Sequence, residues 1–234
     1  MFCYNHETLT RTAVSHLPAA SDRDYDVLFV DDGSTDGTPN VVNGLPGTEL
    51  IRHESNRGIG AAIRTAIHHA LNQGYRYIVL MAGNGKDDFR EVPRLLEPLL
   101  SDAADYVQGS RFLDGGAFEN LPLGRLVLLK FHAVFFTLVT RRKTTDASNG
   151  FRAYRLTLFN DRRINIHQDW LDRYELETYL HMKVHWLGYR VSEVAVSKTY
   201  PPKKAGLKYS HIRPFIDWWS ILRPILLLAF RIRK

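Results

Sequence analysis

Two neighbouring carboxylates, Asp31 and Asp32, follow a run of four apolar residues at 27–30. Such a run is typical of a buried strand in a parallel sheet. Open α/β sheets bind ligands at the carboxyl ends of their strands, so both acids stand where a ligand is expected. Gly33 permits a sharp turn close to that ligand. A plain turn and helix cap over 32–35 is the alternative interpretation, and the complete string favours the binding edge.

A second polar loop follows the predicted strand 77–81. This loop is rich in glycine and carries one amide and two carboxylates, Asn84, Asp87 and Asp88. Clustered oxygen ligands on such a turn suit Mg²⁺ or Mn²⁺. The alternative is a solvated loop whose acids cap the helix predicted over 89–100, and the loop by itself favours neither interpretation.

Three other features point to an anionic ligand or to its neutralisation. Gly58 and Gly60 precede a predicted helix and would let backbone N–H groups approach an anion, although the sequence lacks the full dinucleotide and P-loop motifs. Arg111 leaves another predicted strand at a position where it would neutralise an anion. Asp146 is a third acid in a polar stretch, for which a turn around 149–150 is the alternative.

These residues need a scaffold in which several strands end at one edge. Apolar strands alternate with amphipathic helices, which predicts right-handed βαβ units and an α/β fold with a mainly parallel, Rossmann-like sheet and flanking helices. The first strand has only two or three residues before Tyr4, so the chain is expected to start late. The other predicted strands are 27–30, 49–52, 77–81, 105–111 and 190–196, and the predicted helices are 9–17, 39–43, 63–71, 89–100 and 175–186.

Length and composition bound the class of protein. The 234 residues are enough for one large α/β domain with an appendage, and 44 % hydrophobic with 24 % charged residues is an ordinary globular composition. The single cysteine, Cys3, excludes a disulfide framework and a cysteine-rich zinc site. The N-terminus lacks the basic start and apolar run of a signal peptide. We expect one domain over 1–210 and a basic, apolar C-terminal segment over 211–234.

The positive charge is concentrated near the C-terminus. The formal net charge is +6, and residues 198–234 carry nine Lys or Arg and one acid, so the remaining residues sum to −2. Because this tail is also rich in Trp, Leu, Ile and Phe, it favours a membrane surface over a nucleic-acid backbone. A nucleic-acid partner is therefore not expected. The loop 198–210 contains lysine and glycine and is expected to act as a mobile lid.

Two apolar stretches bear on how the protein meets a membrane. The stretch 126–139 is interrupted by Lys130 and His132 and is expected to be too short to cross a bilayer. One of its faces is expected to pack in the core and the other to lie near lipid. Pro224 is expected to break the second apolar stretch. We therefore predict no transmembrane helix and a peripheral position on the cytoplasmic face of a membrane.

Taken in order, six strings of the sequence resemble the inverting glycosyltransferases of family 2, which have a GT-A fold. Within that family the similarity is to the polyprenyl-phosphate sugar synthases, of which dolichol-phosphate mannosyltransferase is the familiar member. The ordered set extends from residue 4 to about residue 210, and the string 30–38 is its most specific piece. The strings occupy residues 4–7, 30–38, 56–64, 108–111, 146–152 and 193–194.

This resemblance implies a nucleoside diphosphate sugar as donor and a polyprenyl phosphate as acceptor. It implies that Asp32 holds the nucleobase or ribose, and that the loop 82–88 corresponds to the Asp-X-Asp metal loop of the family. The implied catalytic residues are Arg111, Arg125 and Asp146, with the arginines on the donor diphosphate or acceptor phosphate. The implied metal ligands are Asn84, Asp87 and Asp88. The implied nucleotide-sugar-binding residues are Tyr4, Glu7, Asp31, Asp32, Asn56, Gly58, Gly60, Lys86 and Lys208.

The metal loop departs from the family pattern. Ala82 stands where the family has its first acid and cannot bind a metal, and Asn84 is a neutral ligand where the family has its second acid. Lys86 lies inside the loop, and a lysine ammonium can neutralise phosphate. We expect a divalent cation, Mg²⁺ or Mn²⁺, and hypothesise that Lys86 replaces part of its charge.

The expected chemistry is governed by charge. Sugar transfer creates an oxocarbenium-like centre and a diphosphate leaving group, whose new charge must be stabilised by a metal, Lys or Arg. A lipid phosphate acceptor is already an anion near pH 7, so it has little need of a general base. Arg111, Arg125 and the loop residues Lys203, Lys204 and Lys208 would form a cationic clamp. The alternatives are another saccharide or lipid acceptor, or a non-catalytic nucleotide-sugar-binding protein, which the altered metal loop would favour.

Overall fold

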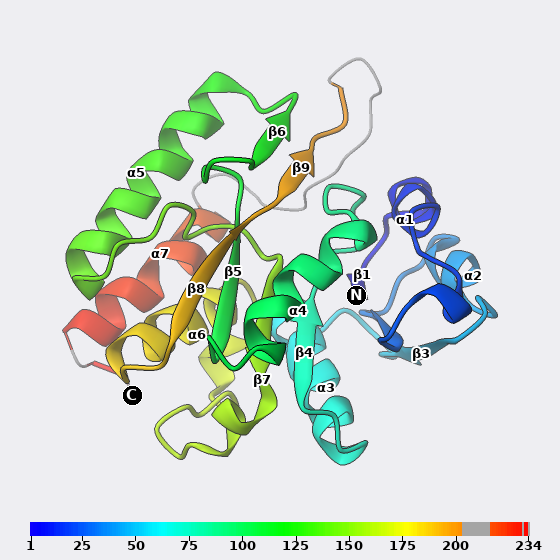
Figure 1. Ribbon diagram of the computed structural model, residues 1–234, viewed down its shortest axis with the longest axis horizontal. Helices are drawn as coiled ribbons and strands as arrows, with labels where there is room; N and C mark the ends of the chain where they lie inside the picture. Colours follow the sequence, from blue (N-terminus) through cyan, green and yellow to red (C-terminus); the bar gives the residue numbers. More distant parts are fainter. Residues whose placement is uncertain (203–215, 231, 234) are drawn as a thin grey trace.

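The structure is a computed structural model that describes residues 1–202, 216–230 and 232–233. Its helices flank a central sheet (Figure 1), which is the α/β arrangement that the alternating sequence pattern predicts. Lys208 and the rest of the predicted lid beyond residue 202 lie outside the described residues. The α-helices of the described residues are α1 (Glu7–Val14), α2 (Thr38–Val42), α3 (Ile59–Asn72), α4 (Val92–Leu100), α5 (Leu123–Thr140), α6 (Glu175–Trp186) and α7 (Ile216–Ala229).

The central sheet has two parts that meet beside the N-terminus. An isolated parallel bridge between Phe2 and Ala82 joins them. The strands of the first part pair in parallel, and in sheet order they are β1 (Phe2–Cys3), β2 (Val27–Asp31) and β3 (Thr48–Arg52). The strands of the second part, in sheet order, are β4 (Tyr77–Leu80), β7 (Arg152–Arg155), β5 (Tyr106–Ser110) and β8 (Val191–Ala195).

Strand β7 is the exception to the parallel arrangement. It runs antiparallel to both β4 and β5, whereas β5 and β8 are parallel. The predicted mainly parallel sheet is therefore confirmed, with one antiparallel strand inserted between two strands that point the same way. As a result, the carboxyl ends of β1, β2, β4 and β5 all reach one edge of the sheet.

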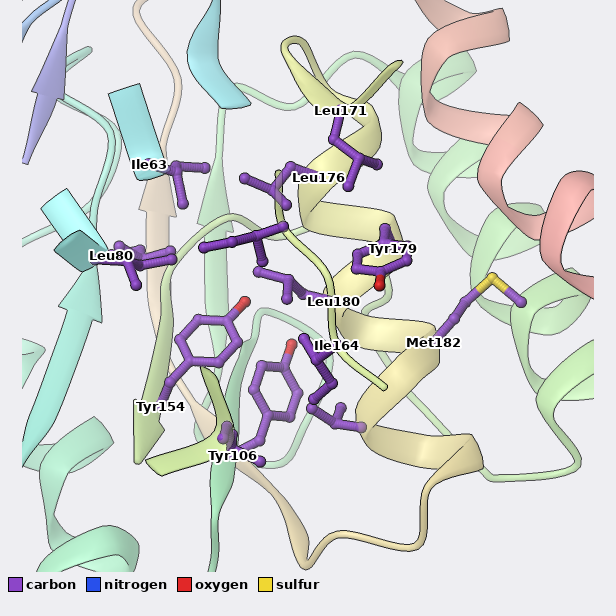
Figure 2. Close-up of a cluster of buried hydrophobic side chains, with 14 of the residues drawn as sticks. Ile63, Leu80, Tyr106, Tyr154, Ile164, Leu171, Leu176, Tyr179, Leu180 and Met182 are labelled. Carbon is purple, nitrogen blue, oxygen red and sulfur yellow. The ribbon is translucent and has the colours of Figure 1, made fainter. Parts of the chain in front are cut away.

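The hydrophobic core lies on both faces of the sheet. Successive residues of β5 and β7 alternate between its two halves, with Tyr106 and Tyr154 in one half and Val107 and Ala153 in the other. The first half fills the space between the sheet and helices α3, α6 and α7, and Figure 2 shows its two tyrosines beside Leu180 of α6. The second half packs against α4. Because buried side chains pack against both faces of β5 and β7, the ends of these strands are held in fixed positions.

Helix α7 corrects the prediction for the C-terminal segment. The sequence predicts a break at Pro224, but α7 continues through that residue. A proline removes one backbone hydrogen bond from a helix. Burial of Ile225 and Leu228 in the core, where α7 packs against α6, offsets that loss. Part of the basic, apolar segment therefore belongs to the core.

Helix α5 also differs from its prediction. It has 18 residues, and by length and composition alone it is sufficient to cross a membrane, so the expectation that the stretch is too short is wrong. One face of α5 packs in the protein, where His132, Ala133 and Phe136 are buried. The opposite face is exposed, as the two-faced interpretation predicts.

The predicted lid begins as a strand rather than a loop. Ser197–Thr199 form β9, which pairs in parallel with the short strand β6 (Ala117–Glu119). Lys198 is buried in this strand, so the part of 198–210 that the structure describes is fixed against the domain. The alternation that predicts the edge strand 190–196 continues past Val196, which accounts for the difference.

Strand β1 is only two residues long, as the brief apolar start of the chain predicts. The amine of Met1 is buried and donates a hydrogen bond of 2.6 Å to the carbonyl of Leu28. Burial lowers the pKa of this amine to about 6. Next to β1, the edges of β2 and β4 line a cavity of about 1330 Å³, with Val27 and Val79 among its walls.

Candidate active site

A pocket of about 450 Å³ opens at the carboxyl ends of β1, β2 and β4, and its size suits a small-molecule ligand. Loops after these strands form one side, and residues of α5, α6 and β9 contribute the other. The predicted site residues that line the pocket are Tyr4, Asp32, Asn56, Gly58, Asn84, Lys86, Arg111 and Arg125. The described predicted site residues that do not line it are Glu7, Asp31, Gly60, Asp87, Asp88 and Asp146.

Asp32 organises the loop that follows β3. Its Oδ1 contacts His53 Nδ1 at 2.7 Å and accepts a hydrogen bond from the Arg57 amide at 3.0 Å. Its Oδ2 accepts hydrogen bonds from Asn56 Nδ2 at 3.0 Å and from the Gly58 amide at 2.8 Å. A carboxylate has about four acceptor positions, so these four groups fill its capacity. Asp32 therefore fixes the loop, and a nucleoside would have to displace one of these partners to reach it.

Gly58 and Gly60 are glycines because another segment approaches them closely. Gly58 has a φ of +99°, and side chains at either position would clash with the backbone carbonyls of Leu171 and Asp172. The amide of Gly58 donates to Asp32, and the amide of Gly60 donates to the carbonyl of Asp172, each at 2.8 Å. Both amides thus serve protein oxygens, and the predicted anion cradle is not formed in this structure.

Asp31 and Glu7 lie outside the pocket. Asp31 is buried, and its carboxylate accepts a hydrogen bond from the Ser34 amide at 3.2 Å and pairs with Arg52 at 3.1 Å. Glu7 begins α1 and forms a surface ion pair of 3.3 Å with an arginine one turn further on. Asp31 therefore stabilises the turn after β2, whereas its neighbour Asp32 reaches the pocket.

The loop that carries Tyr4 is tied to the turn after β2. The Thr35 amide donates to Asn5 Oδ1 at 2.8 Å, and the His6 amide donates to Thr38 Oγ1 at 2.9 Å. These bonds join the first string of the family resemblance to the second. They hold Tyr4 at the pocket wall.

Arg111 and Asp146 form a buried ion pair in the pocket wall. Arg111 Nε donates to Asp146 Oδ2 at 2.6 Å, and Nη2 donates to Oδ1 at 2.7 Å. Burial alone would raise the pKa of Asp146, but the Arg111 guanidinium holds it below its usual value. Arg111 Nη1 also donates to the Tyr200 hydroxyl at 2.5 Å. Arg111 thus reaches the pocket with its charge balanced, and Asp146 acts through it.

The loop after β4 is anchored against the N-terminal residues. The Thr10 hydroxyl donates to the Gly83 carbonyl at 2.8 Å, and the Gly83 amide donates to the Phe2 carbonyl at 2.8 Å. Asn84 lines the pocket, and its buried Oδ1 accepts no hydrogen bond from any described residue. The loop therefore presents one amide oxygen as a ready acceptor at the pocket.

The two acids of this loop have protein partners, although Oδ2 of Asp87 is buried and accepts no hydrogen bond from any described residue. Asp87 Oδ1 accepts a hydrogen bond of 2.5 Å from Lys198 Nζ in a buried ion pair. Asp88 caps the 3₁₀ turn Phe89–Glu91, and its carboxylate accepts hydrogen bonds of 3.0 Å from Arg90 Nε. The helix-capping interpretation therefore describes Asp88.

The donor set of this loop fits a divalent cation poorly. Mg²⁺ and Mn²⁺ prefer carboxylate oxygens, but Ala82 has no side-chain oxygen and Asn84 offers only a neutral amide. Within the described part of the chain, no group of three or more His, Cys, Asp or Glu residues is placed to hold a metal. Two lysines, Lys86 and Lys198, lie next to Asp87. The predicted set of three ligands is therefore not assembled.

Lys86 is a buried cation at the pocket wall. Burial, followed by the charges of Lys198 and Arg125, lowers its pKa well below the usual value. Its Nζ lies 5.6 Å from the centre of the Tyr200 ring, and Arg125 Cζ lies 5.3 Å from the same ring centre. Both distances are within the range of cation–π attraction. Together with the hydrogen bond from Arg111, these contacts make Tyr200 the common neighbour of three cations.

Lys198, Tyr200 and Glu177 are among the pocket residues that the sequence-based prediction of the site did not include. The sequence signal that could have identified Lys198 and Tyr200 is the alternation of residues that continues through β9, because residues two apart in a strand point to the same side. Glu177 lies in the first turn of α6, and burial raises its pKa. An acid in the first turn of a helix is common, so its position in sequence carries no functional signal.

The fold and the pocket define the class of this protein. The sequence matches the family described as glycosyl transferase family 2 over residues 1–163, which is more than half of the chain. The chain belongs to glycosyl transferase family 2, and it is a glycosyltransferase. The predicted family is therefore confirmed.

Curated relatives of this chain include three transferases. It is 29 % identical to the undecaprenyl-phosphate mannosyltransferase of Micrococcus luteus, over 74 % of this chain and 71 % of that protein. It is 34 % identical to the polyprenol monophosphomannose synthase of Mycolicibacterium smegmatis, over 55 % and 50 % of the two chains. It is 27 % identical to the UDP-N-acetylglucosamine–dolichyl-phosphate N-acetylglucosaminyltransferase of Methanococcus voltae, over 64 % and 66 %. The matched segments thus cover from half to less than three quarters of these relatives.

Solved structures confirm the GT-A fold. The chain superimposes on glucosyl-3-phosphoglycerate synthase of Mycobacterium tuberculosis in complex with UDP with a TM-score of 0.68, at 15 % identity, over 100 % of this chain and 79 % of that chain. The complex of that enzyme with phosphoglyceric acid gives a TM-score of 0.71. Other structures of the same enzyme contain Mn²⁺ with UDP-glucose, or Mg²⁺ with UDP.

Proposed function

We propose that this glycosyltransferase moves a sugar from a nucleoside diphosphate sugar to a polyprenyl phosphate, with inversion at the sugar C1. The names of three curated relatives, which include a dolichyl-phosphate, an undecaprenyl-phosphate and a polyprenol, support this acceptor. The observation that carries the proposal is the pocket, where the loop of Asp32 and Asn56 lies beside the cations Lys86, Arg111 and Arg125. Such a pocket suits a ligand with a nucleoside at one end and two phosphates at the other.

The transfer step balances without a proton acceptor. An anionic oxygen of the acceptor phosphate gives an electron pair to the sugar C1, and the bond from C1 to the donor phosphate oxygen breaks. That electron pair leaves on the nucleoside diphosphate. Because a phosphate monoester is already ionised near pH 7, no base is required. The protein must instead hold two anions in line, which is the proposed role of Arg111 and Arg125.

Helix α5 supports a membrane surface as the place of this reaction. Its exposed face carries a row of large apolar side chains, each between 59 % and 75 % exposed, which we call the α5 stripe: Leu123, Val127, Phe131, Val134 and Leu138. Three exposed basic residues follow the helix at 141–143. Apolar side chains next to basic ones are typical of helices that lie on anionic bilayers. The same helix contributes Arg125 to the pocket, so a lipid phosphate held at that surface would be near the donor.

A donor panel tests the proposed reaction. Labelled GDP-mannose, UDP-glucose and UDP-N-acetylglucosamine are each incubated with a short polyprenyl phosphate, with Mn²⁺ or with EDTA. We expect labelled lipid from one donor, and a product whose anomeric configuration is inverted. Donor binding without transfer to any acceptor would instead support a non-catalytic nucleotide-sugar-binding protein.

A hydroxyl acceptor is the second candidate, and Glu177 is the observation that favours it. This acid lines the pocket, and its burial raises the pKa of the carboxyl group, which is the tuning expected of a general base. Replacement of Glu177 by Gln separates the two candidates. Transfer to a phosphate should fall no more than about threefold, whereas transfer to a hydroxyl should fall at least a hundredfold.

A further inference from the structure

The pocket carries a strong excess of positive charge. Its described lining residues include seven Lys or Arg and two Asp or Glu. Counting the two acids directly behind the wall, Asp87 and Asp146, the balance is still about +3, from seven cations and four acids. A pocket of this sign attracts a diphosphate and disfavours a free divalent cation.

The loop in which the family resemblance implies a metal site carries a lysine, Lys86, that lines the pocket. Ala82 and Asn84 replace the two acids of the family's Asp-X-Asp pattern, and Oδ1 of Asp87 accepts a hydrogen bond from Lys198 Nζ at 2.5 Å. The oxygens left without a hydrogen bond from any described residue are Asn84 Oδ1 and Asp87 Oδ2, one neutral and one shared with an ion pair. Lys86, two residues after Asn84, lines the pocket from the same loop. A cation is therefore present at this position of the loop, but it is a side chain.

Tyr200 is the common neighbour of Lys86, Arg125 and Arg111. The ring lies 5.6 Å from Lys86 Nζ and 5.3 Å from Arg125 Cζ, and the hydroxyl accepts a hydrogen bond from Arg111 Nη1 at 2.5 Å. The ring is itself buried at the end of β9. Three cations that come from distant parts of the chain thus share one rigid aromatic neighbour, which limits their movement when a ligand leaves.

We infer that the chain stabilises the leaving nucleoside diphosphate with the side-chain cations Lys86 and Arg125, positioned by Tyr200, and needs no divalent cation for that step. The inference rests on the proposed function. When the bond from C1 to the donor oxygen breaks, the electron pair stays on the diphosphate, and the side chains of Lys86 and Arg125 balance the added charge. Tyr200 is a positioning residue, because it acts through the cations.

Nucleotide binding in the absence of metal tests the inference apart from transfer. Binding of UDP and of GDP to the full chain is measured by calorimetry in EDTA and in Mn²⁺. We expect one of the two nucleotides to bind with affinities in EDTA and in Mn²⁺ that agree within about twofold. The Lys86→Met replacement should weaken binding of that nucleotide at least tenfold in both buffers. Lys183→Met is the matched control, since Lys183 also lies near a tyrosine ring, at 5.7 Å, but outside the pocket. Thermal unfolding of each variant verifies its fold.

Two variants of Tyr200 separate its positioning role from a structural one. Tyr200→Phe keeps the ring, so binding in EDTA should fall by less than about threefold, whereas Tyr200→Leu should lower it at least tenfold. If Phe and Leu lower binding equally while both proteins unfold at the wild-type temperature, Tyr200 does not position the cations.

The outcomes distinguish the inference from the function on which it rests. Binding or transfer that requires Mn²⁺ and is unchanged by Lys86→Met overturns the inference and leaves the proposed function standing. If neither UDP nor GDP binds in either buffer, the proposed function fails, and the inference fails with it.

Discussion

At the scale of single residues, the pair of Arg111 and Asp146 determines the shape of the pocket wall. Both side chains are buried, and their two hydrogen bonds of 2.6 and 2.7 Å fix the guanidinium plane. A buried cation that loses its counter-ion is strongly destabilising, whereas an exposed pair contributes little. We therefore expect the pair to matter to folding and, under the proposed function, to transfer.

Replacement of Asp146 by Asn should lower the free energy of unfolding by about 3 kcal/mol, because Arg111 is left buried with an uncompensated charge. Transfer should fall at least tenfold, since the arginine loses its fixed orientation. Urea unfolding and the transfer assay measure the two effects. Glu7→Gln, which breaks an exposed pair, should cost about 0.5 kcal/mol and leave transfer unchanged. Equal losses of stability in the two variants would contradict this account of the pair.

The neighbours Asp31 and Asp32 allow a matched comparison, because both are buried but only Asp32 lines the pocket. Asp32→Asn should cost about 2 kcal/mol of stability and weaken nucleotide binding at least tenfold, since the loop at 56–58 loses its acceptors. Asp31→Asn should destabilise the turn by a similar amount and change nucleotide affinity by less than about twofold. Calorimetry with UDP and GDP measures the affinities. The assignment fails if both variants weaken binding alike.

At the scale of elements, helix α5 has one buried face and one exposed face. Its buried face holds His132, Ala133 and Phe136 in the protein, and its outer face carries the α5 stripe. Apolar side chains that enter a bilayer each contribute about 1.5 kcal/mol or more, so a row of them can hold a protein at a membrane.

The double replacement Phe131→Ser with Leu138→Ser should therefore reduce binding to anionic phosphatidylglycerol vesicles at least tenfold. Both positions are exposed, so the unfolding free energy should change by less than about 0.5 kcal/mol for each. Co-sedimentation at low salt measures vesicle binding. Leu100→Ser, at another exposed leucine outside α5, is the control and should have no effect. Unchanged sedimentation of the double variant would exclude the α5 stripe as the contact surface.

The elements show what local pattern can and cannot predict. The run 27–30 and the apolar face of α3 identify their elements because burial and period agree. The helix through Pro224 was not predictable, since only tertiary packing of Ile225 and Leu228 outweighs the proline. The strand β9 was missed for a related reason, because its pairing partner β6 lies about 80 residues earlier in the chain.

The site shows a similar division. Types and spacing predicted Asp32, Gly58, Asn84 and Arg111, which the loops at one edge of the sheet bring to one pocket. The family resemblance added Tyr4, Asn56, Lys86 and Arg125 to the same pocket. Pair partners were not predictable: Asp146 turns to Arg111, Asp87 turns to Lys198, and the amide of Gly60 turns to Asp172. Which donor satisfies which acceptor depends on side chains brought together from distant segments, and sequence spacing carries no record of it.

At the scale of the whole molecule, three buried histidines link the helices to pH. His132 of α5 and His181 and His185 of α6 are buried, and burial lowers the pKa of His132 and His185 to about 4 and that of His181 well below its usual value. The unfolded chain therefore binds more protons than the folded one between about pH 4 and 6.5. Stability rises with pH across that window and is lost as the pH falls through it.

Urea unfolding at pH 7 and pH 5 should show this loss, at about 2 kcal/mol for each of His132 and His185. His181→Phe, whose new ring would lie among Phe136 and Tyr106, should reduce the difference between the two pH values. His16→Gln, at an exposed position, should leave it unchanged. A wild-type stability that is equal at pH 7 and pH 5 would exclude neutral histidines in the core.

The shared position of α5 has a thermodynamic consequence. Helix α5 carries the α5 stripe on its exposed face and also contributes Arg125 and Leu129 to the pocket. If a bilayer on one face changes the affinity of the donor on the other by some factor, the donor must change the affinity for the bilayer by the same factor. Under the proposed function, the membrane would then act as an effector of the enzyme as well as the store of its acceptor. Donor dissociation constants measured with and without vesicles report that factor directly. A measurement without lipid gives only the donor affinity of the protein that is not bound to a bilayer.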